Sequence, residues 1–411
     1  MSYLLDRPMR LAIYFNQHIH AGGGYQQALN AVLLAKELPQ DVCTVLCFTT
    51  TQSNIDSLKA YGIDAILFPL SKWQRVILNI RGRLKWYAVK WIRFLFGLNK
   101  IEAFFVQYEV DLVYFISPTR LAHALEKLNY ITTVWDICHR DHPEFPEVRD
   151  YREFERREEL YRNILSKAFA VLVDSPESRK NIVHCYGLDD SRVYVMPFSP
   201  AISTDISDDQ YYADFVDMKL KYKIQYDYIF YPAQFWAHKN HVYILQGLKI
   251  LEQQYGVKLG AVFSGEDSGG NLWYVQQNVR IFSLEDRIYF TGFVPNKDIP
   301  YLYRQSIALV MPTYFGLTNL PPLEAFRLGV PVLYSDLPGL KEQVAGAALL
   351  VDLKDPHDLA KKLYRLIADA ALRRDLIDCG RKKSIVNSPT VCLEILLGII
   401  RDFAIKRKCW Y

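Results

Sequence analysis

Short apolar runs alternate with longer amphipathic stretches through most of the chain. Residues 10–15 (Arg-Leu-Ala-Ile-Tyr-Phe) predict a buried strand, and three glycines at 22–24 separate it from a helix-like stretch at 25–38. Further apolar runs predict strands at residues 43–48, 65–68, 112–116, 131–135 and 170–173. Strands that alternate with helices in this order predict a parallel sheet covered on both faces, which is a Rossmann-type α/β domain.

The alternation lapses between residues 200 and 226, where Ser, Asp and Tyr replace the apolar runs. A second series of predicted strands then follows, at residues 228–231, 259–264, 288–290, 307–311 and 332–334. Two series predict two Rossmann-like domains. We place an N-terminal domain at 1–200, a linker at 201–226, a C-terminal domain at 227–389 and a terminal helix at 390–411.

Composition narrows the class of protein. The 411 residues suffice for two domains of ordinary size, and 50% hydrophobic with 23% charged residues is typical of a globular protein. A net charge of +4 does not by itself indicate a nucleic-acid binder. The seven cysteines include no Cys-x-x-Cys pair, which argues against a zinc ribbon and favours reduced thiols in the cytoplasm. We expect neither a signal peptide nor a membrane-spanning helix.

The loop that follows the predicted strand ending at Met311 carries the densest candidate chemistry. It leads into a helix that contains Glu324 and stops at Gly329, just before the next strand. Loops at the carboxyl ends of parallel strands bind ligands in open α/β sheets, and backbone N–H groups at a helix start attract phosphate. The loop is therefore a candidate anion site.

Its sequence, Tyr-Phe-Gly-Leu-Thr-Asn-Leu-Pro-Pro-Leu-Glu, resembles the donor-sugar motif of the retaining glycosyltransferases of family 4. Those enzymes have the GT-B architecture, two Rossmann-like domains with parallel sheets facing a central cleft. In that family a Glu-x7-Glu pattern places one acid near the donor sugar and a second acid on the ribose hydroxyls. Glu324 matches the second acid, whereas Gly316 stands where the first is found. The resemblance is to the polysaccharide and O-antigen branch of the family.

The same resemblance implies further donor-binding residues in the C-terminal domain. Backbone N–H groups in the loop would hold the diphosphate, from Leu317, Thr318, Asn319 and Leu320. The stretch 231–241 resembles the family's Arg-x4-Lys diphosphate clamp, with Lys239 at the lysine position and Gln234 where arginine is commoner. A lysine at a helix start can also meet phosphate as a point charge, although a solvated lysine in a turn is the alternative. Gly265 follows another strand, and the resemblance assigns the nucleotide base to Phe293 and Val294.

The N-terminal domain has two candidate regions. Gly22, Gly23 and Gly24 allow the backbone to approach a phosphate or sugar closely, and the resemblance implies contact with the donor diphosphate. Asp136 and His139 lie where the family often has a His-Asp pair, and they could orient the acceptor or contact the donor sugar. A loop of solvated charges with one satisfied histidine is the alternative. Zinc binding near His139 is far less favoured, because no ligand spacing matches a closed site.

Residues 72–100 contain eight Lys or Arg, no Asp or Glu, and three tryptophans. Basic residues interleaved with aromatics are typical of an interfacial segment that lies on anionic lipid. The alternative is a solvated basic helix that covers one face of the sheet. Nucleic acid would be attracted by the same charges, but a nucleotide-sugar site elsewhere favours lipid.

Taken with these features, the resemblance implies a metal-independent, cofactor-free retaining glycosyltransferase. The resemblance favours transfer of a mannosyl or rhamnosyl group from a nucleotide-diphosphate sugar to a glycan or lipid-linked acceptor, on the cytoplasmic face of the cell membrane. Its predicted catalytic residues are Asp136, His139, Lys239 and Glu324. A GT-B epimerase or phosphorylase is a rival, although no lysine context suits pyridoxal phosphate. An inactive GT-B module that binds a nucleotide or a protein is the other alternative.

Overall fold

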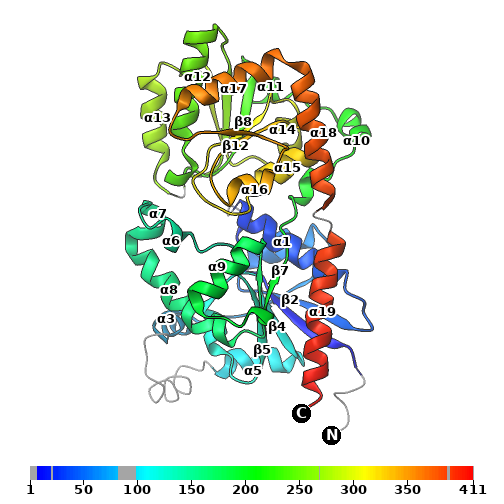
Figure 1. Cartoon of the computed structure of the whole chain (residues 1–411). Coiled ribbons are helices and arrows are strands. Elements are labelled where there is room, and N and C mark those ends of the chain that lie inside the picture. The colour runs from blue at the N-terminus through cyan, green and yellow to red at the C-terminus, as the bar shows by residue number, and fades with distance from the viewer. Residues whose placement is uncertain (1–6, 20–21, 82–98, 268, 387–388, 411) are drawn as a thin grey trace. The chain divides into compact units, whose positions relative to one another are not determined.

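The computed structural model describes residues 7–19, 22–81, 99–267, 269–386 and 389–410 (Figure 1). The chain divides into two compact units. Unit 1 comprises residues 1–141, 151–197 and 389–411, and unit 2 comprises residues 142–150 and 198–388. The segment 142–150 thus belongs to unit 2 by its contacts, although it lies within the N-terminal half of the sequence.

Unit 1 is built on a parallel sheet whose described strands are in the order β3-β2-β1-β4-β5-β6-β7. These strands are β1 (Met9–Tyr14), β2 (Cys43–Thr49), β3 (Ala65–Leu67), β4 (Leu112–Phe115), β5 (Asn129–Thr133), β6 (Ala170–Val173) and β7 (Val193–Val195). Its helices are α1 (Gly23–Lys36), α2 (Gln52–Lys59), α3 (Lys72–Arg81), α5 (Asn99–Gln107), α6 (Cys138–Asp141), α8 (Glu153–Ile164), α9 (Pro176–Tyr186) and α19 (Pro389–Arg407). Short 3-10 turns complete it: η2 (Arg120–Ala124), η3 (Asp150–Arg152), η4 (Leu165–Lys167) and η5 (Asp190–Arg192).

Two apolar cores lie on opposite faces of this sheet, as the side-chain alternation of β1 shows. Leu11 and Ile13 join one core with α1 and α19, whereas Ala12 and Tyr14 join the other with α5 and α8. Figure 1 shows the red C-terminal helix α19 in the same unit as the blue strand β1. Burial on both faces explains why the strands are continuous apolar runs.

Unit 2 contains a second parallel sheet, with its described strands in the order β10-β9-β8-β11-β12-β13. These strands are β8 (Tyr228–Pro232), β9 (Gly260–Ser264), β10 (Ile288–Gly292), β11 (Leu309–Met311), β12 (Val332–Ser335) and β13 (Leu349–Val351). The longer helices are α12 (His241–Tyr255), α13 (Leu272–Ile281), α15 (Leu320–Leu328), α17 (Pro356–Ala368) and α18 (Ala370–Val386). The shorter ones are α7 (Pro146–Arg149), η6 (Ile202–Thr204), α10 (Asp208–Ala213), α11 (Met218–Lys221), η7 (Ala237–Lys239), α14 (Ile299–Arg304) and α16 (Leu340–Val344).

The strand orders confirm the prediction of two Rossmann-like domains. In each sheet the order reverses next to the first strand, between β1 and β4 in unit 1 and between β8 and β11 in unit 2. Ligands bind at such switch points in open α/β sheets, beyond the carboxyl ends of the strands. In unit 2 the loops that leave β8 and β11 carry Lys239 and Asn319.

Two sequence regions need separate mention. The polar stretch 201–226 contains η6, α10 and α11, and these residues belong to unit 2. Most of the basic aromatic segment, residues 82–98, lies outside the described residues. Its described beginning is α3, where Trp73 is 67% exposed and Val76 is also exposed.

Candidate active site

The loops after β8 and β11 meet through two side chains predicted to bind the donor. Lys239 ends the η7 turn, and its Nζ donates to Asn319 Oδ1 at 3.3 Å, across 80 residues of sequence. Asn319 directly precedes α15. The structure therefore brings the lysine and the start of the helix together at the switch point of the sheet, where a diphosphate would meet both.

Buried groups fix the backbone around Lys239. The Tyr231 hydroxyl donates to the Lys239 carbonyl at 3.0 Å, and the Tyr314 N–H donates to the His238 carbonyl at 2.9 Å. Asn240 follows in the left-handed region, with φ of +56°, and begins α12. The lysine thus stands on a constrained turn that is joined to both neighbouring strands of the sheet.

The Asn319 side chain organises the second loop. Its amide Nδ2 donates to the Gly316 carbonyl and to the Tyr334 hydroxyl, each at 2.7 Å. Its backbone N–H donates to Gln343 Oε1 at 3.0 Å, and Gln343 Nε2 donates back to its carbonyl at 2.6 Å. A polar side chain with this many partners holds one loop conformation.

This network changes which N–H groups can receive a phosphate. The Asn319 N–H is already bonded, so the expectation that it contacts the diphosphate is not supported. Pro321 and Pro322 have no N–H to offer in the first turn of α15. Within the part of the chain that the structure describes, the N–H groups of Leu317, Thr318 and Leu320 find no acceptor. These donors, which flank the Asn319 side chain bound by Lys239, are the better candidates for an anion.

Gly316 has a conformation that explains the absent acid. Its φ is +102°, and a Cβ added there would lie 2.9 Å from Asn319 Oδ1. A side chain at this position would therefore be strained and would collide with the residue that organises the loop. The loop as folded needs glycine where the family pattern has its first glutamate.

Glu324 lies on α15 and is buried, with 7% of the residue exposed. The Tyr303 hydroxyl donates to its Oε2 at 2.8 Å. Burial raises the pKa of the Glu324 carboxyl, and the bond from Tyr303 opposes this effect. We name Lys239, Gly316, Asn319 and Glu324 the switch-point cluster.

Other predicted donor residues lie at neighbouring strand ends. The Gly265 N–H donates to the Gly292 carbonyl at 3.0 Å, and a Cβ at Gly265 would lie 2.4 Å from the Ala233 carbonyl oxygen. The ends of β8, β9 and β10 are therefore in close contact. Phe293 is exposed and Val294 is buried, so these neighbours have opposite environments. The Gln234 side chain accepts from Trp236 Nε1 at 2.9 Å within its own turn.

In unit 1 the glycine loop lies beside the end of β5. Gly22 has φ of +60° and precedes α1, and a Cβ at Gly24 would lie 3.1 Å from the Trp135 ring. Close packing against this ring explains the absence of a side chain at Gly24. Two regions predicted separately, Gly22–Gly24 and the stretch that contains Asp136, are thus neighbours in space.

Asp136 is engaged in a local network. Its Oδ1 accepts from the Cys138 N–H at 3.1 Å and from Arg157 Nη1 at 2.8 Å. Burial opposes ionisation of Asp136, but the Arg157 charge and the hydrogen bonds from Cys138 together outweigh burial and lower the pKa of Asp136. The Asp136 side chain remains partly exposed, at 35%.

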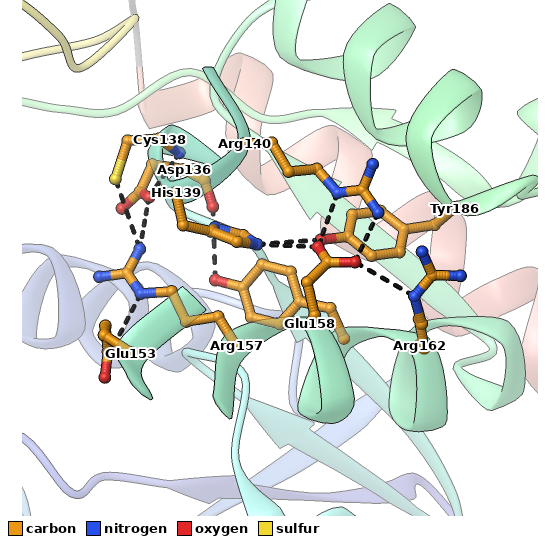
Figure 2. Close-up of polar contacts among 10 residues, drawn as sticks. Asp136, Cys138, His139, Arg140, Glu153, Arg157, Glu158, Arg162 and Tyr186 are labelled. Atoms are coloured by element: carbon orange, nitrogen blue, oxygen red, sulfur yellow. Dashed lines mark hydrogen bonds and ion pairs between the residues drawn. The ribbon is translucent and has the colours of Figure 1, made fainter. Parts of the chain in front are cut away.

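His139 lies inside this region of unit 1 (Figure 2). The residue is 0% exposed, and its Nε2 lies 3.0 Å from Glu158 Oε1. Burial lowers the pKa of His139 despite the nearby carboxylate of Glu158. A ring with no exposed surface cannot touch a ligand in this conformation, which argues against the expected contact of His139 with sugar or acceptor.

Glu158 is the centre of these contacts. Arg140 donates to both of its oxygens, at 2.6 and 2.5 Å, and Tyr186 and Arg162 donate at 2.7 and 3.1 Å. These donors overcome the effect of burial and lower the pKa of Glu158 to about 2. We name Asp136, His139, Arg140, Arg157 and Glu158 the α8 cluster, because its contacts run along α8 (Figure 2).

Sequence reasoning missed Tyr303, Tyr334 and Gln343. The two tyrosines occur within or just before predicted apolar strands, where a buried hydroxyl needs a polar partner. That requirement was a usable signal, but it does not identify the partner.

Two features are absent from the described residues: a cluster of metal ligands and a membrane-spanning helix. These residues contain no group of three or more His, Cys, Asp or Glu that could hold a metal ion. None of the helices that the structure describes is long and apolar enough to cross a membrane.

Comparisons with known proteins give one family match and several similar relatives. Residues 217–383 match the family described as Glycosyl transferases group 1. O-antigen chain mannosyltransferase B of Escherichia coli is 28% identical over 273 residues, which are 64% of this chain and 67% of that protein. Serotype-specific mannosyltransferase WbdA of E. coli is 25% identical over 228 residues, 53% of this chain but 27% of WbdA.

The fold is also found among solved structures. HepE of Anabaena, solved in complex with UDP and glucose, superposes with a TM-score of 0.71 at 14% identity, covering 96% of this chain and 100% of HepE. The chain therefore has the GT-B fold. The family match lies within unit 2.

Proposed function

We propose that the protein is a retaining glycosyltransferase that moves a hexosyl group from a nucleotide-diphosphate sugar to a glycan or lipid-linked acceptor in cell-surface polysaccharide synthesis. The observation that carries this proposal is the bond between Lys239 and Asn319 at the switch point of unit 2. This bond holds the Lys239 ammonium group at Asn319, the residue that follows Leu317 and Thr318, whose N–H groups find no acceptor in the described chain. Fixed donors of this kind stabilise the charge that develops on a departing diphosphate.

The other predicted residues receive roles around this diphosphate. Glu324 would hold the ribose hydroxyls, and Phe293 and Val294 would contact the base. The Gly22–Gly24 loop and Asp136 stay predicted contacts of the donor or acceptor in unit 1. We leave His139 out of the catalytic set because it is fully buried.

The relatives guide the choice of sugar and nucleotide. Two of them are named mannosyltransferases, and one of these acts on the O-antigen chain. This favours a mannosyl donor over the rhamnosyl alternative. HepE was solved with UDP, which supports a nucleotide-linked donor for this fold without fixing the base.

A panel of nucleotide sugars tests the reaction. The purified protein is incubated with GDP-, UDP- and dTDP-linked hexoses, with and without a lipid-linked saccharide, and sugar release and transfer are measured. We expect turnover of one donor, with the anomeric configuration retained when the product is examined by NMR. A product with the anomeric configuration inverted relative to the donor would refute the retaining mechanism.

An inactive module that binds a nucleotide is the second candidate. Glycine at position 316 and glutamine at position 234, where the family has an acid and commonly an arginine, favour it. The same panel separates the two, since a module would bind a nucleotide diphosphate without turnover of any donor.

We also propose that lysine and backbone donors make a divalent metal unnecessary. Turnover should then survive EDTA at a concentration that strips Mg²⁺ and Mn²⁺. Loss of activity that returns with added metal would contradict this.

We further propose that the basic aromatic segment 72–100 binds anionic membrane. The exposed Trp73 and Val76 on α3 support this. Each Lys or Arg near such a surface contributes about 1 kcal/mol, and salt weakens the attraction. Wild type should sediment with anionic but not neutral liposomes, whereas a variant with Gln at Arg81, Arg83, Lys85, Lys90 and Arg93 should be released. Equal sedimentation of both proteins, or of neither at low salt, would refute the proposal.

A further inference from the structure

The segment 142–150, which we call the strap, leaves unit 1 and packs on the donor loops of unit 2. Phe145 contacts Tyr314 and Phe315, with ring centroids 5.3 and 5.5 Å away, and His142 stacks on Phe315 at 5.5 Å. Phe315 in turn stacks on His238 at 3.7 Å. Aromatic contacts therefore join the strap to both loops of the switch point.

Glu147 supplies the polar contact of the strap. Its Oε1 accepts from the His238 backbone N–H at 3.0 Å and also lies within hydrogen-bond distance of His238 Nδ1. Both side chains are buried, with 8% of Glu147 and 9% of His238 exposed. His238 is the middle residue of η7, and the next residue is Lys239.

The chain returns to unit 1 directly after the strap in a strained conformation. Tyr151 and Arg152 have φ of +54° and +61°, and two consecutive non-glycine residues in the left-handed region are unfavourable. Surrounding contacts must hold this geometry.

We propose that Glu147 is a positioning residue for Lys239, a role that rests on the proposed diphosphate site. The carboxylate fixes the backbone and the ring of His238, and through them the turn from which Lys239 extends. Glu147 binds the η7 turn and not the ligand, so its effect on diphosphate affinity acts through the position of Lys239. A segment from the N-terminal half of the sequence thus completes the donor site of unit 2.

A double-mutant cycle tests this role. Affinities for a nucleoside diphosphate and for the free nucleoside are measured by calorimetry in wild type, Glu147→Ala, Lys239→Ala and the double variant. We expect Glu147→Ala to weaken diphosphate binding about tenfold, as for loss of one charge-assisted hydrogen bond, and to leave nucleoside binding unchanged. In the Lys239→Ala background it should add little, because the two residues act as one unit.

Control variants separate positioning from folding. Glu144→Ala changes another strap carboxylate, which is 65% exposed, and should change neither affinity nor melting temperature. Glu147→Gln keeps an acceptor for the His238 N–H and should recover part of the affinity. It also provides the comparison if Glu147→Ala does not fold.

The failures are distinguishable. If Lys239→Ala itself leaves diphosphate binding unchanged, the proposed diphosphate site is wrong. If Lys239→Ala weakens binding but Glu147→Ala does not, or the two losses simply add, positioning by Glu147 is wrong. A loss confined to nucleotide sugars, with the diphosphate unaffected, would also overturn it and would make Glu147 a direct sugar ligand.

Discussion

The switch-point cluster of unit 2 and the α8 cluster of unit 1 differ in how their polar groups are paired. In the α8 cluster, Glu158 accepts from two arginines and a tyrosine, and His139 has no exposed surface. In the switch-point cluster, Lys239 meets a neutral amide oxygen beside N–H groups that find no acceptor in the described chain. Both regions are rich in polar residues in the sequence. We take N–H donors without an acceptor as the feature that distinguishes a binding site from a structural network.

Replacing Glu158 should have the largest effect, and on stability. Glu158→Ala removes a buried carboxylate that accepts from Arg140, Arg162 and Tyr186. Because Arg162 is itself 64% exposed, we expect a loss of about 3 kcal/mol, as for charge-assisted hydrogen bonds and not for a fully buried ion pair. Urea denaturation measures the loss. Glu155→Ala on the same helix is the matched control, because Glu155 is exposed. Equal losses in the two variants would show that the α8 cluster is not structural.

Acid should weaken the same contacts. The pKa of Glu158 is lowered to about 2 in the folded protein, so its contribution is present above its ordinary pKa near 4.5 and is lost as pH falls towards 2. The stability gap between wild type and Glu158→Gln, which cannot titrate, should shrink between pH 5 and pH 3. A constant gap would contradict the assigned pKa.

Glu324→Ala should act on ligand binding. Loss of a hydrogen-bonded carboxylate on the ribose would weaken nucleotide affinity about tenfold to a hundredfold, equivalent to about 1.5–3 kcal/mol. Glu324→Gln retains an acceptor for Tyr303 and controls for loss of folding. Circular dichroism reports the fold and calorimetry the affinity. Unchanged donor affinity in a folded Ala variant would exclude the ribose role.

His139→Gln should have the smallest effect, and only on stability. Its bond to Glu158 contributes about 1 kcal/mol. The KM for the donor and kcat should match those of wild type, because a buried ring does not reach a ligand. A large fall in kcat with unchanged stability would instead restore His139 as a catalytic residue.

The sequence predicted the fold well because both sheets are buried on two faces, which produces apolar runs that need no knowledge of partners. It also indicated Lys239 and Asn319 as candidate donor residues, because each follows a predicted strand at a position where ligands bind, and the structure places the two in contact. The burial of His139 could not be predicted, because it depends on how α8 and α9 pack against the loop. A local motif does not show whether its polar groups are already paired.

Two other features were beyond sequence reasoning for different reasons. The requirement for glycine at position 316 follows from the Asn319 side chain, which folds back over it. The strap, with Glu147 bound to His238, joins residues 91 positions apart and interrupts the domain in which it begins. The pattern of apolar and polar residues does not show that the strap belongs to the other unit.

The most direct test of the central claim is a calorimetric titration of Lys239→Ala with a nucleoside diphosphate and with the free nucleoside. Lys258→Ala, which removes an exposed lysine elsewhere in unit 2, is the control. We predict that Lys239→Ala weakens diphosphate binding about tenfold to a hundredfold and leaves nucleoside binding unchanged, while the control matches wild type. Equal losses for both ligands, or no loss for either, would contradict a diphosphate site at the switch point of unit 2.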